Sequence, residues 1–359
     1  MPVTTGMKGD GWYDRHSSPQ MAAIDAVLPW LLEAVGNLRL GSKPGPVVIA
    51  DFGCSEGRNS IAATKRIIEA VGDRHGRSIQ TIHSDLPTNN FNQLFANLHP
   101  GGNSVFAAPD VFSAAVSGSM FDQLLPSNSV AVASTFNAIG FLNQRPATPV
   151  PDYILPMGPG RPRPGVDVSP EARQAYAAQA RDDLVRFYEA RAAEMITGGK
   201  LLVASFGSSE RHRACDGIYD VVNDALLDLV ANNRLRREAY ERLVLPIYFR
   251  SVQELIEPVA NDSFALSTFF QLDKSDTIEV AVPFNERFQA SADVFAYAKE
   301  YTNFIRAFTE PIIRMTFEGE PGLDSVITEL YAKIEARLAD DPVGYAFRFV
   351  QVAALLTRR

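Results

Sequence analysis

Cysteine and long hydrophobic runs are both scarce in this 359-residue sequence. Its two cysteines, Cys54 and Cys215, are too few for a disulfide framework, and neither has a partner at the spacing of a zinc site. No apolar run reaches the ~18 residues of a membrane helix, and residues 1–20 lack the apolar segment of a secretory signal. We therefore expect a cytoplasmic protein without a membrane span.

An excess of basic residues is also missing. The 34 Lys and Arg residues are outnumbered by 42 Asp and Glu residues, which gives a net charge of −8. Nucleic-acid binding normally requires a basic face, so we expect no nucleic-acid partner. The chain is longer than a typical single domain, which predicts one large core with insertions or with a cap.

The most informative stretch is residues 46–59, which read PVVIADFGCSEGRN. A run of β-branched and apolar residues ends in Asp51 and two glycines, and helix-compatible residues 61–71 follow. This pattern predicts a buried parallel strand, a tight turn and a helix N-terminus. Such a turn can hold a cofactor, because glycine lets backbone approach a ligand and a helix start offers unpaired N–H groups. The alternative is that Asp51 only caps a helix.

The rest of the chain alternates between strand-like and helix-like patterns, which predicts crossover units and an open, parallel α/β sheet. Further strands are expected at residues 78–87, 104–111, 129–136, 200–207, 264–272, 277–282 and 345–356. Helices are expected at residues 19–32, 90–98, 170–196, 218–230, 252–259, 291–315 and 323–338. The proline-rich residues 144–170 predict an irregular insertion.

Two cofactor classes fit a glycine turn at a strand end. A dinucleotide is disfavoured, because the turn GCSEG does not match G-x-G-x-x-G and Glu56 would repel a pyrophosphate. S-adenosylmethionine carries a sulfonium and an ammonium and no phosphate, so an acid at the turn is favourable. Asp85, at the end of the second strand, can then bind the ribose. The residues favour S-adenosylmethionine and leave the dinucleotide as the alternative.

Several segments resemble motifs of the SABATH family of S-adenosylmethionine-dependent methyltransferases, which methylate carboxyl groups of small acids and, in some plant members, ring nitrogens of xanthines. Residues 49–59 resemble the family's Ile-Ala-Asp-Leu-Gly-Cys-Ser-Ser-Gly-Pro-Asn, and residues 85–92 (DLPTNNFN) resemble its Asp-Leu-Pro-x-Asn-Asp-Phe-Asn. Shorter matches lie at residues 7–9, 13–20, 119–126 and 308–311. The resemblance covers nearly the whole chain. It implies a class I methyltransferase-like, Rossmann-like α/β fold with a mostly parallel seven-stranded sheet and an α-helical cap, and it suggests a homodimer.

On this basis the chain is expected to have four parts. They are an N-terminal flap over the active site (residues 1–20), an S-adenosylmethionine-binding α/β core (21–207, with the insertion 144–170), a mainly helical cap (208–262), and a part that completes the sheet and adds cap helices (263–359, with helices in 291–318). For the first part, a frayed tail is the alternative.

The resemblance implies a cofactor site built by the flap and the strand ends. Asp85 is expected on the ribose hydroxyls, Leu86 and Met120 against the adenine, and Ser119 at the adenine edge. From the residues alone, Leu86, Met120 and Phe136 would be ordinary core. The complete predicted set is Tyr13, Ser17, Asp51, Gly53, Cys54, Asn59, Asp85, Leu86, Ser119, Met120 and Phe136.

The acceptor site departs from the family. The family's substrate-facing His-Trp pair falls on Gly140 and Phe141, so the indole N–H that usually holds the carboxylate is missing. Gln20 matches the other carboxylate-holding position and is the predicted catalytic residue, through positioning of the carboxylate. The predicted substrate contacts are Lys8, Gln20, Asn137, Gly140 and Phe141, with solvated surface as the alternative for Lys8.

The function that follows is methyl transfer to the carboxylate of a small, apolar fatty or aromatic acid, which gives a methyl ester. No general base is needed, because a carboxylate is already ionised at neutral pH. No metal is expected, because residues 241–245 lack the Asp and the Asn of the family's metal-binding members. The alternatives are N- or O-methylation of a neutral heteroatom, which needs a base such as His16, and a non-catalytic cofactor-binding relative.

Overall fold

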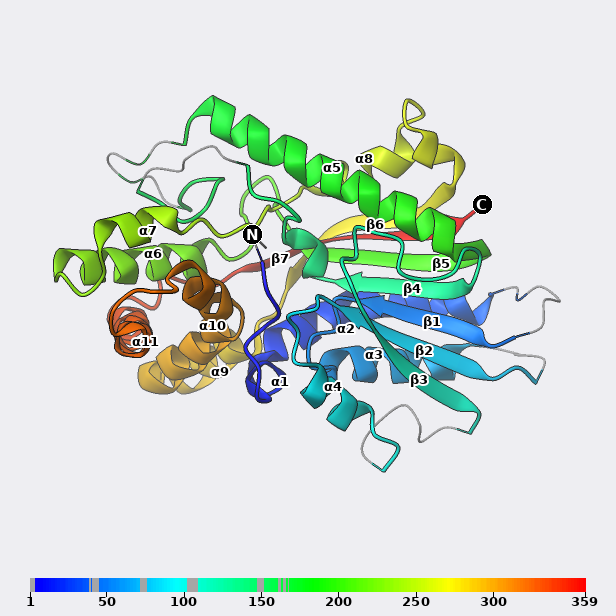
Figure 1. Cartoon of the computed structure of the whole chain (residues 1–359), viewed down its shortest axis with the longest axis horizontal. Helices are drawn as coiled ribbons and strands as arrows, with labels where there is room; N and C mark the ends of the chain where they lie inside the picture. Colours follow the sequence, from blue (N-terminus) through cyan, green and yellow to red (C-terminus); the bar gives the residue numbers. More distant parts are fainter. Residues whose placement is uncertain are drawn as a thin grey trace.

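The computed structural model describes residues 4–38, 40, 45–71, 76–101, 109–146, 152–160, 163, 166 and 168–359. A seven-stranded sheet with the order β3-β2-β1-β4-β5-β7-β6 forms its centre (Figure 1). The strands are β1 (Val47–Phe52), β2 (Ile79–Asp85), β3 (Val111–Ser117), β4 (Val130–Phe136), β5 (Met195–Phe206), β6 (Phe270–Val280) and β7 (Phe349–Arg358).

The first five strands pair in parallel, and β7 is antiparallel to both of its neighbours. This confirms the predicted mostly parallel, seven-stranded sheet. Strand order reverses between β1 and β4, whose residues are almost all buried. Continuous apolar runs of this kind are typical of central parallel strands covered on both faces. The carboxyl ends of β1 and β4 therefore mark the point where a ligand is expected.

Helices cover both faces of the sheet (Figure 1). On one face α2 (Ser18–Gly36) and α3 (Arg58–Ala70) pack into one hydrophobic cluster, beside α4 (Phe91–Leu98). On the other face α5 (Pro170–Glu194) and α8 (Val252–Ala260) pack into a second cluster.

The remaining helices form a cap beyond the carboxyl ends of the parallel strands, on the left of Figure 1. They are α6 (Asp216–Ala231), α7 (Arg237–Arg242), α9 (Pro283–Ser291), α10 (Val294–Thr316) and α11 (Leu323–Asp340), and their apolar side chains belong to a third cluster. The short helix α1 (Trp12–His16) lies beside α10. Among the described residues, no helix is long and apolar enough to cross a membrane.

Strands β5 and β3 do not begin at the predicted residues. β5 begins at Met195, so Gly198 and Gly199 lie inside the strand and do not separate it from α5. Gly198 has a φ of 82°, and the pairing of β4 with β5 shifts register after Val130, so the glycines accommodate a bulge. β3 begins at Val111, after Asp110 with its left-handed φ of 58°; residues 104–108 of the predicted strand lie outside the described residues.

The last part of the sheet also differs from the prediction. The prediction has two strands here, at residues 264–272 and 277–282, but residues 265–268 form a 3-10 turn, and β6 is one strand from Phe270 with a register shift after Leu272. It is an edge strand, where polar side chains face solvent. β7 begins at Phe349 and not at Tyr345.

Candidate active site

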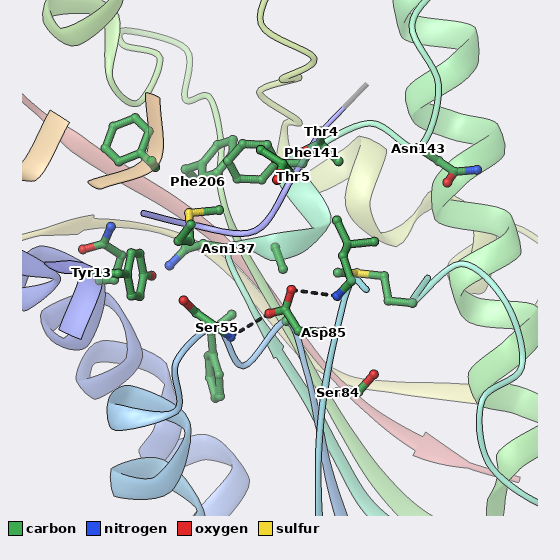
Figure 2. Close-up of a pocket in the computed structure, with 18 of the residues that line it drawn as sticks. Thr4, Thr5, Tyr13, Ser55, Ser84, Asp85, Asn137, Phe141, Asn143 and Phe206 are labelled. Atoms are coloured by element: carbon green, nitrogen blue, oxygen red, sulfur yellow. Dashed lines mark hydrogen bonds between the residues drawn. The ribbon is translucent and has the colours of Figure 1, made fainter. Parts of the chain in front are cut away.

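A cavity lies at the carboxyl ends of the parallel strands, under the N-terminal segment (residues 4–16) (Figure 2). Its strand-end half is lined by the loops after β1, β2 and β3 and by Tyr13: Tyr13, Gly53, Ser55, Ser84, Asp85, Leu86, Gly118, Ser119 and Met120. Its aromatic half is lined by residues 141 and 206 and by the cap and β7: Phe141, Phe206, Cys215, Tyr219, Phe304, Phe308, Phe347 and Phe349. Gln20, Phe136 and Asn137 also line the cavity.

The glycine turn after β1 has the predicted geometry. Gly53 and Gly57 have φ angles of 93° and 105°, which disfavour any other residue. A Cβ on Gly53 would lie 2.2 Å from the Cβ of Ala138, in the 3-10 turn after β4 (Ala138–Gly140). A Cβ on Gly57 would lie 2.6 Å from the Leu94 side chain. The glycines therefore let the turn pack tightly between β4 and α4.

Asp85 provides the negative charge of the strand-end half. Its two carboxylate oxygens accept hydrogen bonds from the backbone N–H of Ser55 (2.6 Å) and of Leu86 (2.8 Å), as Figure 2 shows. Burial raises the pKa of Asp85 to about 6, with a further contribution from the charge of Asp51, although the two N–H groups oppose the shift. No cation pairs with Asp85 in the described part of the chain, so its remaining lone pairs are available to a ligand.

Glu56 does not face the cavity, which corrects the expectation that its charge acts on the cofactor. Its Oε1 accepts hydrogen bonds from the backbone N–H of Gly11 (2.9 Å) and from Nδ2 of Asn90 (3.1 Å). The side chain is buried. Glu56 therefore fastens the N-terminal segment to the core beside α4.

Four predicted cofactor residues lie behind the wall of the cavity. Asp51 accepts a hydrogen bond from Oγ of Ser134 (2.8 Å), and Nδ2 of Asn59 donates to Oγ of Ser17 (3.1 Å). Burial raises the pKa of the Cys54 thiol well above its ordinary value, which disfavours a nucleophilic thiolate. None of these side chains lines the cavity, so any influence on a ligand passes through their neighbours.

Lys8 also lies outside the cavity. Its ammonium is 2.9 Å from Oε1 of Glu310, and its backbone N–H donates to the carbonyl of Ala307. Arg306 and Arg314 bind the same carboxylate. Burial alone would raise the pKa of Glu310, but these three cations outweigh it and hold the pKa below its ordinary value. Lys8 thus fastens the N-terminal segment to α10, in place of the predicted contact with substrate.

A buried ion pair forms hydrogen bonds with the backbone of the loop that carries Ser119 and Met120. Arg191 and Glu194, at the end of α5, are both fully buried, with 2.7 Å between Nε and Oε2. The guanidinium donates to the carbonyl of Met120, and Glu194 accepts from the backbone N–H groups of residues 124 and 125. This pair fixes the loop in the strand-end half, and no sequence motif had indicated it.

Gln20 and Asn137 bring unpaired amide groups to the cavity. Both atoms of the Asn137 carboxamide and Oε1 of Gln20 are buried without a hydrogen-bond partner among the described residues. Asn137 has a φ of 66°, which turns the chain immediately after β4. In Figure 2 it lies between Ser55 and Asp85 on one side and the rings of Phe141 and Phe206 on the other. Burial of an unpaired polar group costs about 1–3 kcal/mol, so these amides are suited to a polar ligand.

Phe141 lines the cavity as predicted, but Gly140 does not. A Cβ on Gly140 would lie 2.2 Å from Cζ of Phe206, so this glycine makes room for Phe206. The rings of Phe141 and Phe206 meet edge to face, with 5.8 Å between their centroids.

Most of the aromatic half was missed by the sequence reasoning, because β5, α6, α10 and β7 each contribute isolated rings without a motif. The signal that could have found them is weak: Phe308 falls in one of the shorter matched segments, but nothing marked it as a cavity residue. In the described ranges no group of three or more His, Cys, Asp or Glu side chains could hold a metal ion.

Comparison with known proteins places the chain among methyltransferases. A family model described as SAM dependent carboxyl methyltransferase matches residues 2–359. Indole-3-acetate O-methyltransferase 1 of Oryza sativa subsp. japonica is 30% identical over 290 residues, which are 73% of this chain and 71% of that protein. Gibberellic acid methyltransferase 2 of Arabidopsis thaliana is 25% identical over 331 residues, 86% of this chain and 82% of that protein.

The fold has a close match among solved structures. The structure of loganic acid methyltransferase with SAH has a TM-score of 0.79 at 22% sequence identity, and the match covers 99% of this chain and 98% of that chain. This agreement confirms the predicted class I methyltransferase-like fold.

Proposed function

This chain belongs to the family of S-adenosylmethionine-dependent carboxyl methyltransferases, and we propose that it methylates the carboxylate of a small, apolar carboxylic acid to give a methyl ester. The family assignment confirms the resemblance to the SABATH family and S-adenosylmethionine as the methyl donor. The observation that carries the proposal is that Asn137, whose carboxamide is buried and unpaired, and Gln20, whose Oε1 is buried and unpaired, line a cavity with Asp85 in one half and aromatic rings in the other.

The residues of the strand-end half fit the cofactor. Asp85 has lone pairs that no cation engages in the described chain, as hydrogen bonds from ribose hydroxyls require, and Oγ of Ser55 is a buried polar atom without a partner there. Leu86 and Met120 offer apolar surface for the adenine, with Ser119 at its edge. When bound, S-adenosylmethionine supplies a methyl carbon on a positively charged sulfur, which makes that carbon an electrophile.

The acceptor carboxylate is held by the two carboxamides. Nδ2 of Asn137, which is buried without a partner among the described residues, donates one hydrogen bond to the carboxylate, and Nε2 of Gln20, which also lines the cavity, donates another; neither neutralises its charge. Asn137 takes the place of the indole N–H that this chain lacks at Phe141. The aromatic half receives the apolar body of the acid, and relatives named for gibberellic acid, indole-3-acetate and farnesoic acid act on carboxylic acids.

The reaction depends on the alignment of the reacting atoms and on the exclusion of water, and it does not depend on proton transfer. A carboxylate oxygen forms the bond to the methyl carbon while the carbon–sulfur bond breaks, the electron pair stays on sulfur, and no proton has to move. The carboxamides orient the attacking oxygen. Residues 4 and 5, Met7 and Tyr13 of the N-terminal segment cover the cavity and exclude water that would solvate the carboxylate.

Methylation of a neutral heteroatom is not favoured by the placement of His16. Its ring lies 4.5 Å from that of Trp12, and its Nδ1 is 2.8 Å from the carbonyl oxygen of Trp12. It does not line the cavity, so it is not positioned as a general base there.

The test is a panel of aromatic and fatty acids, supplied with S-adenosylmethionine labelled in its methyl group. We expect labelled product that mild alkali cleaves, as a methyl ester requires. Binding of S-adenosylhomocysteine without turnover of any acid, or an alkali-stable product, would contradict the proposal. Gln20→Ala and Asn137→Ala should each raise KM for the acid and leave the affinity for S-adenosylhomocysteine unchanged.

We also propose that the protein is a cytoplasmic homodimer. Light scattering during gel filtration tests the dimer, and fractionation of the source cells tests the location.

A further inference from the structure

One polar group in the aromatic half has no part in the proposed reaction. Tyr219, on α6, lines the cavity and is 2% exposed. Its hydroxyl has no hydrogen-bond partner among the residues that the structure describes, and its ring packs against Phe249 with 5.9 Å between centroids. A phenol hydroxyl of a residue that lines a ligand cavity, with no protein partner of its own, can offer a ligand both a donor and an acceptor.

Tyr219 is separated from the carboxamides by a run of rings. Phe141, four residues after Asn137, contacts Phe206 at 5.8 Å, Phe206 contacts Phe249 at 5.6 Å, and Phe249 contacts Tyr219. Asn137 belongs to the end of β4 in the sheet, whereas Tyr219 belongs to the cap. A ligand whose carboxylate lies at Asn137 therefore reaches the Tyr219 hydroxyl only across an apolar body.

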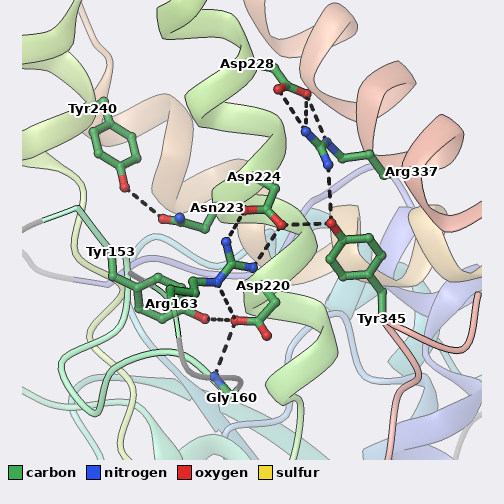
Figure 3. A network of polar contacts seen from close by, with 10 residues as sticks. All are labelled: Tyr153, Gly160, Arg163, Asp220, Asn223, Asp224, Asp228, Tyr240, Arg337 and Tyr345. Carbon is green, nitrogen blue, oxygen red and sulfur yellow. Dashed lines mark hydrogen bonds and ion pairs between the residues drawn. The ribbon is translucent and has the colours of Figure 1, made fainter. Parts of the chain in front are cut away.

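The helix that carries Tyr219 is fixed by a network of polar contacts (Figure 3). Asp220 accepts hydrogen bonds from Tyr153 and from the backbone N–H of Gly160, and Asp224 pairs with Arg163 through both oxygens. These contacts join α6 to the described parts of the 144–170 insertion.

The same helix is fixed at two more points. Asp228 accepts both a 2.9 Å and a 2.8 Å hydrogen bond from the guanidinium of Arg337 on α11. At the start of α6, a Cβ on Gly217 would lie 2.4 Å from the carbonyl oxygen of Tyr345, so the helix packs directly on that backbone. A hydroxyl on such a fixed helix cannot move away from a ligand that offers it no partner, which makes it selective.

We propose that the acceptor is an apolar acid with a second oxygen, a hydroxyl or a carbonyl, remote from its carboxylate, and that the Tyr219 hydroxyl selects this oxygen. The inference rests on the proposed carboxyl methylation and deepens it. Burial raises the pKa of Tyr219 well above its ordinary value, so the phenol stays neutral and can both donate and accept at neutral pH.

The test compares ω-hydroxy fatty acids of increasing length, and hydroxylated phenylalkanoic acids, each with its unsubstituted parent. For the best pair, the wild type should prefer the oxygenated acid by about tenfold in kcat/KM, the value of one neutral hydrogen bond. The same preference should appear in the Kd measured by calorimetry with S-adenosylhomocysteine present. In Tyr219→Phe the ratio between the two acids should fall to about one.

Tyr297→Phe is the matched control, because Tyr297 is similarly buried, has no hydrogen bond to its hydroxyl within the described ranges and does not line the cavity. It should keep the tenfold preference. Equal use of both acids by the wild type, or a preference that survives in Tyr219→Phe, would overturn the inference and leave carboxyl methylation intact. Methylation of neither kind of acid would overturn both.

Discussion

The two halves of the cavity are built in different ways. The strand-end half comes from turns that directly follow β1, β2 and β3, and its central contacts are backbone N–H groups that bind Asp85. The aromatic half comes from single rings on β5, α6, α10 and β7, which are far apart in the chain. The first half is determined mainly by local backbone geometry, and the second by long-range packing. The halves should therefore respond separately to substitution.

The largest effect is expected at the ion pair that holds the loop of the strand-end half. Arg191→Met leaves Glu194 charged and fully buried, and should lower the free energy of unfolding by about 3–5 kcal/mol. Urea denaturation followed by circular dichroism measures this. Glu329→Gln, in the partly exposed pair with Arg234, is the control and should cost about 1 kcal/mol or less. Equal losses in the two variants would contradict the buried-pair account.

The next effect concerns pH and the strand-end half alone. Because the pKa of Asp85 is raised to about 6, its carboxyl group is protonated below that pH and accepts hydrogen bonds from ribose hydroxyls less well. Affinity for S-adenosylhomocysteine should be constant above pH 7 and should fall by up to about tenfold per pH unit below pH 6. Calorimetric titrations over this range measure it. Asp85→Asn should bind weakly with little pH dependence, and a wild-type profile as flat as that of the variant would exclude the role of Asp85.

A smaller effect is expected from a substitution that changes the aromatic half and leaves the strand-end half unchanged. Gly140→Ala places a methyl group against Phe206, and overpacking of about 1–3 kcal/mol should disturb the aromatic half. We expect KM for the acid to change by about tenfold while the affinity for S-adenosylhomocysteine stays the same. Gly36→Ala, where a Cβ has no neighbour closer than 3.9 Å, is the control. Loss of cofactor affinity in Gly140→Ala would show that the halves are not independent.

The smallest effect is expected at Lys8. Its ammonium binds Glu310 and does not reach the cavity, and Arg306 and Arg314 still bind that buried carboxylate without it, so Lys8→Met should cost only about 1 kcal/mol in stability. KM for the acid should remain within about threefold of the wild type. A much larger increase in KM would restore the sequence-based prediction that Lys8 binds substrate.

The difference between local backbone geometry and long-range packing also explains which features could be predicted from the sequence. The strand, turn and helix at residues 46–59 and the position of Asp85 follow from apolar periodicity and glycine, which act locally, and the structure has both as expected. The predicted boundaries of β5 and β6 are wrong, because a bulge in β5 and the exposed edge position of β6 outweigh the local sequence pattern.

Side-chain direction was less predictable than backbone position. Glu56 and Lys8 lie in matched segments, but their partners, Gly11 and Glu310, are distant in sequence and turn both side chains away from the cavity. Gly140 likewise leaves room for the ring of Phe206, which lies 66 residues later in the sequence. Tyr219 carries no motif, since its importance depends only on the cavity that surrounds it.

The most direct test of carboxyl methylation is the position of the new methyl group on an ω-hydroxy fatty acid, which offers both a carboxylate and a hydroxyl. With methyl-¹³C-labelled S-adenosylmethionine, the carbon spectrum distinguishes an ester from an ether. Carboxyl methylation gives a methyl ester only, with the hydroxyl unmodified. A methyl ether would contradict it, because the carboxylate would then not be the group that Gln20 and Asn137 hold for transfer.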